Sequence, residues 1–215
     1  MMESSTGLIL RTRPLTETSL IVHWLTPALG RIHTVAKGAR RSKSPFLGKL
    51  DLFYVADFSL TRSRRSGLHV LREVNLRDPH RALREDILKL QQAAYPAAFI
   101  EQATETETPL PEIFGLLSGF LNFLCERTVE SRHVFALELK LLRELGLEPD
   151  LAETRLTPGA KKIVAALTEN DWAGISQLKL SAAQTAELRR FLHGFLVFHL
   201  GQLPRGRATA LAGPV

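Results

Sequence analysis

Cysteine and long apolar runs are scarce in this sequence. Cys125 is the only cysteine among 215 residues, so no disulfide can form within the chain and a secreted disulfide scaffold is excluded. No apolar run approaches the roughly 18 residues that a membrane span needs. The polar start of the chain has no basic region before an apolar one. We therefore expect no signal peptide, no membrane partner and a cytoplasmic protein.

The motifs of common catalytic and metal sites are also missing. The sequence contains no GxSxG, P-loop lysine motif, HExxH or GxGxxG. Its seven histidines are scattered, and none is spaced to share a metal ion with another histidine or a carboxylate. Cys125 lies among leucine and phenylalanine residues and is expected to pack as a small hydrophobic side chain. We therefore expect no cofactor, no metal and no enzymatic step.

Positive charge is concentrated in the first third of an otherwise ordinary globular composition. Hydrophobic residues make up 45% of the chain and charged residues 23%, which is enough for a core without disulfides. Residues 1–80 contain 13 Lys and Arg against 6 Asp and Glu, whereas residues 81–215 contain 15 against 16. This asymmetry favours a polyanion as the partner of an N-terminal domain.

The first 77 residues alternate like β-strands. Turn residues separate five candidate strands, at residues 7–13, 18–25, 30–37, 50–60 and 68–76. Five strands with short connections predict a small closed barrel over residues 1–77, for which we favour an OB-fold over an SH3-like barrel.

The longest candidate strand divides into two faces. Its interior face is expected to hold the even-numbered residues Leu50, Leu52, Tyr54, Ala56, Phe58 and Leu60. Phe53 and Val55 fall on the other, mixed face, where they are expected to cover a neighbouring domain.

The sequence changes to helical spacing at Asp78, a favoured N-cap, and Pro79, a favoured first helical residue. Helices are predicted at 82–104, interrupted near Pro96, and then at 112–127, 131–146, 157–167 and 181–203. Ser131, Thr157 and Ser181 are the expected caps. The chain is thus predicted to be α+β, with a barrel at 1–77, a helical domain at 78–203 and a flexible tail at 204–215.

The strongest functional signal is a basic loop between the third and fourth strands. Lys37, Arg40, Arg41 and Lys43 place four cations within seven residues. Such a set can neutralise phosphates in a salt-dependent manner. Other cations at strand ends and in the turn after the long strand are expected to extend a basic face: Arg31, Arg11, Arg13, Arg62, Arg64 and Arg65. Phe46, inside the loop, is expected either to stack on a base or to anchor the loop on the barrel.

The N-terminal segment resembles the start of the RecO family of bacterial DNA repair proteins. The resemblance is carried by LRTRPLTETSLIV at 10–22, LT at 25–26, GR at 30–31 and AKGARR at 36–41. The later segment LELKLLRELGLEPDL, at 137–151, is compatible with the same family. The resemblance is close over residues 7–41 and looser over the rest. It implies an OB-fold followed by a helical domain, in a recombination mediator that performs no bond chemistry.

The family resemblance also implies particular partners. Such proteins bind single- and double-stranded DNA, anneal complementary strands and lie with the nucleoid. With RecR they help load RecA onto DNA coated by single-stranded DNA-binding protein, whose acidic C-terminal tail docks on the helical domain. Helical cations near apolar faces are the candidates for that tail, although ordinary surface salt bridges explain them equally well: Arg127, Arg132, Lys140 and Arg143.

One departure from the family pattern concerns zinc. Many members insert a four-cysteine zinc module after the GLxPxL segment, but here residues 148–158 contain no cysteine. No zinc module is therefore expected. Two other readings of the chain stay open at this point: a protein-interaction scaffold whose basic charge is incidental, and an RNA-binding factor.

Overall fold

The chain forms two compact units in a computed structural model that describes residues 2–127 and 130–212. The barrel unit comprises Met1–Arg81 and Thr104–Leu121, and the helical unit comprises Ala82–Ala103 and Asn122–Val215. This division differs from the expected boundary at residue 77, because residues 104–121 group with the strands.

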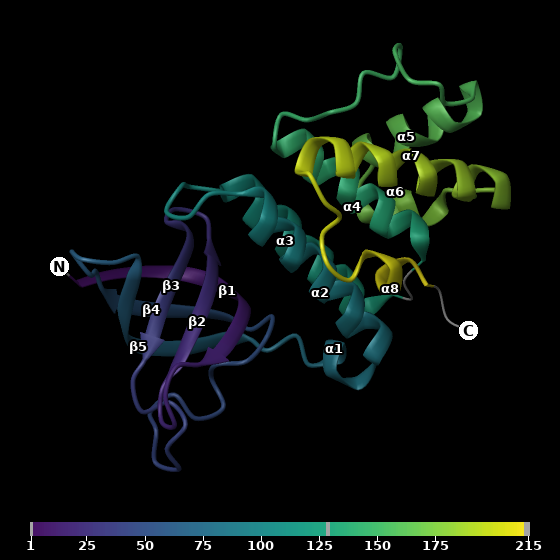
Figure 1. The fold of residues 1–215 in the computed structure, drawn as a ribbon. Helices are drawn as coiled ribbons and strands as arrows, with labels where there is room; N and C mark the ends of the chain where they lie inside the picture. The colour runs from purple at the N-terminus through teal and green to yellow at the C-terminus, as the bar shows by residue number, and fades with distance from the viewer. Residues whose placement is uncertain (1, 128–129, 213–215) are drawn as a thin grey trace. The chain divides into compact units, whose positions relative to one another are not determined.

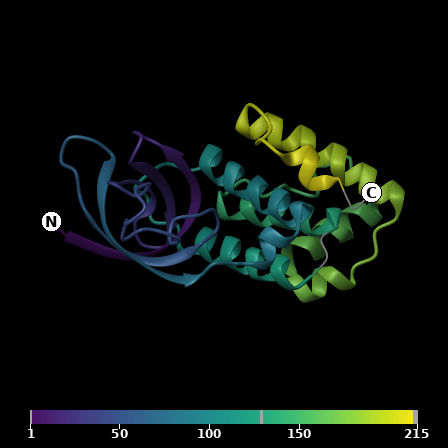
Figure 2. The same cartoon turned by 90° about the horizontal axis from the view of Figure 1, so that it is seen from below.

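Five strands close into a barrel (Figures 1 and 2). They are β1 (Met2–Pro14), β2 (Leu20–Thr26), β3 (Gly30–Ala36), β4 (Val55–Thr61) and β5 (Leu68–Asp78). Their order around the barrel is β1-β2-β3-β5-β4, and every pairing is antiparallel except β3 with β5. The predicted five-stranded OB-fold is confirmed.

The barrel encloses a core of alternating apolar side chains. Ala56, Phe58 and Leu60 point inward from β4, as the alternation predicts. The rings of Trp24 and Phe58 stack at 4.2 Å between centroids. Because a buried indole N–H needs an acceptor, Trp24 Nε1 donates to Thr34 Oγ1 at 2.8 Å. Both aromatic rings belong to the barrel core.

The strand predicted at residues 50–60 begins later, at Val55. Phe53 has a φ of +62°, which a bulky residue adopts only when its surroundings impose it. Its N–H donates to Ile9 O at 2.8 Å, and its carbonyl accepts a hydrogen bond from His80 Nδ1 at 2.6 Å. Alternation therefore stops at this turn, and the Phe53 side chain is buried.

Residues 104–110 group with the barrel because they pack on the turn between β2 and β3. Gly30 has a φ of +64°, and a Cβ atom there would lie 1.7 Å from the Thr108 carbonyl oxygen. Glu107 N donates to Arg31 O at 2.9 Å, and Leu110 N donates to Pro27 O at 3.1 Å. Only glycine allows this close approach.

The helical segments surround a central helix, α4, in which residues 133–142 are all buried. The helices of the described residues are α1 (Ala82–Glu85), α2 (Ile87–Ala103), α3 (Pro111–Glu126), α4 (Ser131–Glu144), α5 (Pro158–Glu169), α6 (Trp172–Gln177), α7 (Ala182–Leu200) and α8 (Arg207–Leu211). The first part of α3 groups with the barrel and its last turns with the helical unit.

Local capping signals predicted several helix ends correctly. Thr157 accepts a hydrogen bond from Ala160 N, and Ser181 forms a reciprocal capping box with Gln184. Gly146, with a φ of +70°, follows the end of α4 as predicted.

Other predicted boundaries are wrong. β5 continues to Asp78, whose side chain accepts from His80 N, so Asp78 and Pro79 do not begin a helix, and the first helix begins at Ala82, where the helical spacing was predicted to start. Pro96 lies inside α2 without ending it. Glu130, and not Ser131, caps α4. The short helix α6 was not predicted.

The tail expected to be flexible is folded as far as residue 212. Arg207, in α8, is 5% exposed and forms a bidentate ion pair with the fully buried Glu138, at 2.6 Å and 2.9 Å. Tyr95 Oη donates to the same carboxylate at 2.5 Å. Burial alone would lower the pKa of Arg207, but the hydrogen bonds and charge of Glu138 raise it. Residues 213–215 lie outside the described residues.

A buried histidine makes the helical unit sensitive to acid. Burial and the charge of Arg132 lower the pKa of His133 to about 4. Its Nδ1 accepts from Glu130 N at 3.1 Å, and its Nε2 lies 3.2 Å from Ser176 Oγ. The neutral ring is therefore the form that fits the fold.

The free energy of unfolding is expected to fall by about 3 kcal/mol as pH drops from about 6.5 to about 4, because unfolded His133 takes up a proton in this range and folded His133 does not. Urea unfolding of the wild type and of His133→Gln, followed at several pH values, measures this effect. The difference in stability between the two proteins should shrink towards pH 4. A difference that stays constant with pH would contradict the assignment.

Candidate nucleic-acid interface

The basic loop is held rigidly on the barrel. After β3 the chain makes successive tight turns, including Arg41 N to Gly38 O at 3.1 Å and Ser44 N to Arg41 O at 3.1 Å. Ala39 and Phe46, which flank Arg40, Arg41 and Lys43 in the sequence, insert into the barrel core. The loop therefore has little freedom to collapse, and its charged side chains project outward.

The turn between β1 and β2 supports the loop from the side. Arg40 N donates to Thr18 O at 3.0 Å, and the Arg40 guanidinium donates to Thr16 O at 3.2 Å. In Figure 1 the turn and the loop lie together at the lower end of the barrel. Exposed cations from β1 and the loop gather here, and we call them the basic end: Arg11, Arg13, Lys37, Arg40, Arg41 and Lys43.

Few acidic residues lie near the basic end in the sequence. Glu17 is the only acidic residue from position 10 to position 49. The segment that carries the basic end is therefore strongly cationic, as a phosphate-binding surface requires.

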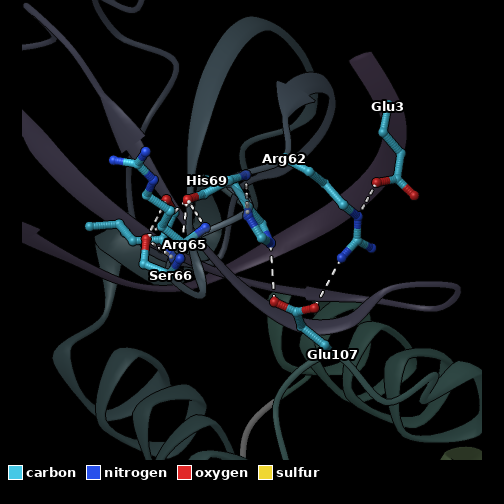
Figure 3. A network of polar contacts seen from close by, with 8 residues as sticks. Glu3, Arg62, Arg65, Ser66, His69 and Glu107 are labelled. Atoms are coloured by element: carbon cyan, nitrogen blue, oxygen red, sulfur yellow. Dashed lines mark hydrogen bonds and ion pairs between the residues drawn. The ribbon is translucent and has the colours of Figure 1, made fainter. Parts of the chain in front are cut away.

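The second predicted cluster, in the turn between β4 and β5, is organised differently (Figure 3). Arg62 binds Glu3 at 2.6 Å and Glu107 at 3.0 Å, and the hydrogen bond to Glu3 raises the pKa of Arg62. His69 Nε2 lies 3.2 Å from the other oxygen of Glu107, while its Nδ1 accepts from Ser63 N. The charge of Arg62 is thus largely neutralised by the carboxylates of Glu3 and Glu107, which belong to the barrel unit.

The two clusters do not form one continuous face. Thr61, just before the second cluster, pairs with Met2 at the start of β1, whereas Pro14, at the other end of β1, pairs with Leu20 near the basic end. The length of β1 separates them. Arg64 and Arg65 are exposed, but at the far end of the strand from Lys37.

Two of the residues predicted to contact DNA are instead buried, with their side chains bound or packed inside the barrel unit. Arg31 is 9% exposed, and its Nε donates to Thr104 Oγ1 at 2.7 Å. Phe46 is 6% exposed and packs in the core. Phe46 therefore anchors the loop on the barrel. The alternative prediction, that its ring stacks on a base, does not fit this buried position.

The four cations considered for tail binding do not form a common patch. Lys140 is buried and donates to Thr168 O at 2.6 Å, and burial lowers its pKa. Arg132 binds Glu130 and Leu178 O, and Arg143 lies 3.2 Å from Glu169. Arg127 is exposed.

A groove between the start of α5 and α7 was missed by sequence reasoning. It measures about 570 Å³, and its lining includes Arg155, Leu156, Thr157, Glu187, Arg190 and Phe191. We call it the α5–α7 groove. The Glu187 carboxylate is occupied there, since it accepts from Thr157 N at 2.7 Å and from Thr157 Oγ1 at 2.9 Å.

Aromatic side chains continue from the groove along α7. The rings of Phe191 and Phe195 are 5.7 Å apart, and His199 follows at 4.3 Å from Phe195. Phe198, beside them, is 83% exposed. Their i, i+4, i+8 spacing is present in the sequence, where it lies next to the core leucines Leu188, Leu192 and Leu196.

Two classes of feature are absent from the part of the chain that the structure describes. None of its helices is long and apolar enough to cross a membrane. Among residues 2–127 and 130–212, no three His, Cys, Asp or Glu side chains are grouped so that they could hold a metal ion.

Comparison with known proteins yields one consistent family. Residues 1–80 match the family model for the recombination protein O N terminal, and residues 84–154 match that for the recombination protein O C terminal. The chain is 32% identical over 212 residues to the DNA repair protein RecO of Bacillus pumilus, which covers 94% of this chain and 81% of that relative.

Two further relatives match over shorter segments. The RecO protein of Alkaliphilus metalliredigens is 33% identical over 152 residues, which are 70% of this chain and 61% of the relative. That of Bacillus subtilis is 31% identical over 151 residues, 70% of this chain and 58% of the relative. These two matches span less than two thirds of the relatives' own length. The two family models and the match to the Bacillus pumilus protein show that this chain belongs to the RecO family of DNA repair proteins.

Proposed function

We propose that the chain binds the phosphate backbone of DNA through the basic end of the barrel and acts as a recombination mediator that anneals complementary strands. The observation that supports it is the gathering of exposed cations on one end of the barrel, on a loop anchored by Ala39 and Phe46. Cations that neutralise phosphates on two strands lower their mutual repulsion, so base pairing becomes the favourable step. No side chain has to make or break a bond.

Binding at the basic end is expected to be indifferent to sequence. The aromatic residues Trp24, Phe46 and Phe58 are all in the core, so the barrel offers none of them as a stacking platform. Contacts are then dominated by phosphates, which carry no sequence information.

Replacing Arg40 and Arg41 together by alanine is expected to weaken binding of a fluorescent single-stranded oligonucleotide and to make it less salt-dependent. Each lost phosphate contact reduces the slope of log K against log salt by about 0.7 for a single strand. Fluorescence anisotropy over a salt series measures both effects. The free energy of unfolding should change by no more than about 0.5 kcal/mol, because both side chains are exposed.

The matched control is the Arg64→Ala, Arg65→Ala variant, which removes the same charge from the turn between β4 and β5. It should keep most of the wild-type slope. A flat salt dependence of the wild type, or an equal loss in the control, would reject the basic end as the DNA site. An RNA strand bound as tightly as DNA would instead favour the RNA-binding alternative.

We further propose that the acidic C-terminal tail of single-stranded DNA-binding protein docks in the α5–α7 groove, with RecR and RecA as the partners that follow in the pathway implied by the family. An acidic apolar tail needs cations beside an apolar surface. Arg155 and Arg190 supply the charge, and Phe191 and Phe198 supply the apolar surface. The cations first considered are mostly buried or paired.

Arg190→Ala is expected to slow annealing of strands coated with single-stranded DNA-binding protein by about tenfold, the effect of losing a charged hydrogen bond. Annealing of the bare strands should be unchanged. The control Arg143→Ala should behave as wild type in both assays. If removing the acidic tail from the coating protein leaves the defect of Arg190→Ala intact, the groove does not bind the tail.

A further inference from the structure

A polar groove lies on the outside of the barrel, where β1, β4 and β5 run side by side. The register places two rows of outward-facing side chains across these strands. Ser4, Ser59 and Glu73 form one row, and Thr6, Asp57 and Asn75 form the next. Together with backbone they enclose about 330 Å³. We call this the outer groove.

The charge of the outer groove is opposite to that of the basic end. Its lining holds two carboxylates, Asp57 and Glu73, and no cation, and the other side chains that line it include serine and threonine hydroxyls and one amide. Residues 1–80 carry more than twice as many cations as acids. An acidic groove on such a barrel repels phosphate and attracts positive groups.

One end of the groove already binds a guanidinium. Asp57 Oδ2 accepts from Arg77 Nε at 2.5 Å, and Asp57 Oδ1 accepts from Thr6 Oγ1 at 2.6 Å. The hydrogen bond from Thr6, assisted by Arg77, lowers the pKa of Asp57 against the opposing effect of burial. In this row the Asp57 carboxylate is therefore charged, and both of its oxygens already accept hydrogen bonds from side chains of the same chain.

In the other row, the Ser59 hydroxyl group lacks such a hydrogen-bond partner. Ser59 is 6% exposed, and no hydrogen-bond partner reaches its Oγ atom among the described residues. Buried hydroxyl groups are nearly always paired, so the unpaired Oγ of Ser59 leaves a hydrogen-bonding position in the lining of the groove for a water molecule or for a donor group of a partner. Glu73, directly across from Ser59 in the ladder, is exposed.

We propose that the Ser59–Glu73 row binds the guanidinium of an arginine carried by a partner protein. The planar guanidinium presents five donors in a fork, which suits a carboxylate and neighbouring hydroxyl oxygens on one surface. Glu73 accepts the charged hydrogen bonds, and Ser59 and Ser4 accept the remaining donors. The arrangement repeats, one row along the sheet, the way in which Asp57 holds Arg77.

The probe is the short peptide acetyl-Gly-Arg-Gly-amide, titrated at constant ionic strength into the full chain while backbone amide resonances are recorded. Its control peptide carries citrulline, which keeps the shape of arginine and removes the charge. The arginine peptide should shift the amides of Ser4, Ser59 and Glu73, and the citrulline peptide should not. Glu73→Gln should weaken binding by up to about fivefold, the upper end of the range for an exposed ion pair.

Two further variants separate this site from general electrostatics and from DNA binding. Glu17→Gln removes an exposed carboxylate elsewhere on the barrel and should leave the peptide affinity unchanged. Arg40→Ala with Arg41→Ala should also leave it unchanged, so the result does not depend on the basic end. Absence of shifts at Ser59 and Glu73, retention of full affinity in Glu73→Gln, or equal binding of spermidine would each overturn the proposal.

Discussion

Replacing Arg207 by alanine is expected to lower the free energy of unfolding of the helical unit by about 3–5 kcal/mol. The change leaves Glu138 fully buried without the two hydrogen bonds that Arg207 now supplies, and because burial raises the pKa of Glu138, its carboxyl must either stay charged without this partner or take up a proton, and both states cost stability. Removing one partner of a buried ion pair costs far more than the pair itself contributes, because the remaining charge has no solvent. Tyr95 alone cannot neutralise it.

The two tryptophans allow this effect to be measured in one unit at a time. Trp24 lies in the barrel unit and Trp172 in the helical unit. In a Trp24→Phe background, fluorescence of Trp172 during urea unfolding reports the helical unit alone. Arg207→Ala should lower the midpoint strongly in that background.

Two control variants test the cause. Arg205→Ala removes an exposed cation two residues away and should have little effect. Glu138→Leu combined with Arg207→Met removes both charges and should recover most of the lost stability. An unchanged midpoint in Arg207→Ala would mean that α8 adds nothing to the helical unit.

Replacing Phe46 by alanine is expected to destabilise the barrel unit by about 3 kcal/mol or more, because it empties a core position and releases the basic loop. DNA binding should weaken as well, since the cations lose their fixed positions. Phe46→Leu keeps most of the buried volume and should cost less than about 1.5 kcal/mol. It should leave DNA binding close to wild type.

The pair of variants distinguishes anchoring from base stacking. A stacking ring contributes about 1–3 kcal/mol per base to binding, so Phe46→Leu would then lose affinity without losing stability. Unfolding followed by Trp24 fluorescence, together with fluorescence anisotropy on a single-stranded oligonucleotide, measures both quantities. Loss of DNA affinity in a stable Phe46→Leu protein would contradict the buried position of the ring.

Local signals in the sequence were sufficient for the architecture. Alternation predicted the barrel strands, and capping residues such as Thr157 and Ser181 predicted where helices begin. These signals depend on residues within about four positions of one another, so they can be read without the fold. The basic loop was also visible, because its cations are adjacent in the chain.

Local signals failed where the deciding partner is distant in the chain. Phe53 interrupts an alternating run because His80 and Ile9 hold its backbone. The composition of the C-terminal segment predicted a flexible tail, but Arg207 binds the carboxylate of Glu138, which lies 69 positions away in the sequence. Composition cannot show such pairs, since burial depends on what the completed fold brings together.

By itself the sequence determined the class of this protein: a five-stranded barrel followed by helices, with a basic loop and no catalytic motif. Only the tertiary structure decided which cations meet solvent. Arg31 and Lys37 look alike in the sequence, but Arg31 is bound to Thr104 and Lys37 is exposed. The physical reason is that a charged side chain interacts with whatever group packs beside it. For Arg31 that group is Thr104, which lies 73 positions away in the sequence.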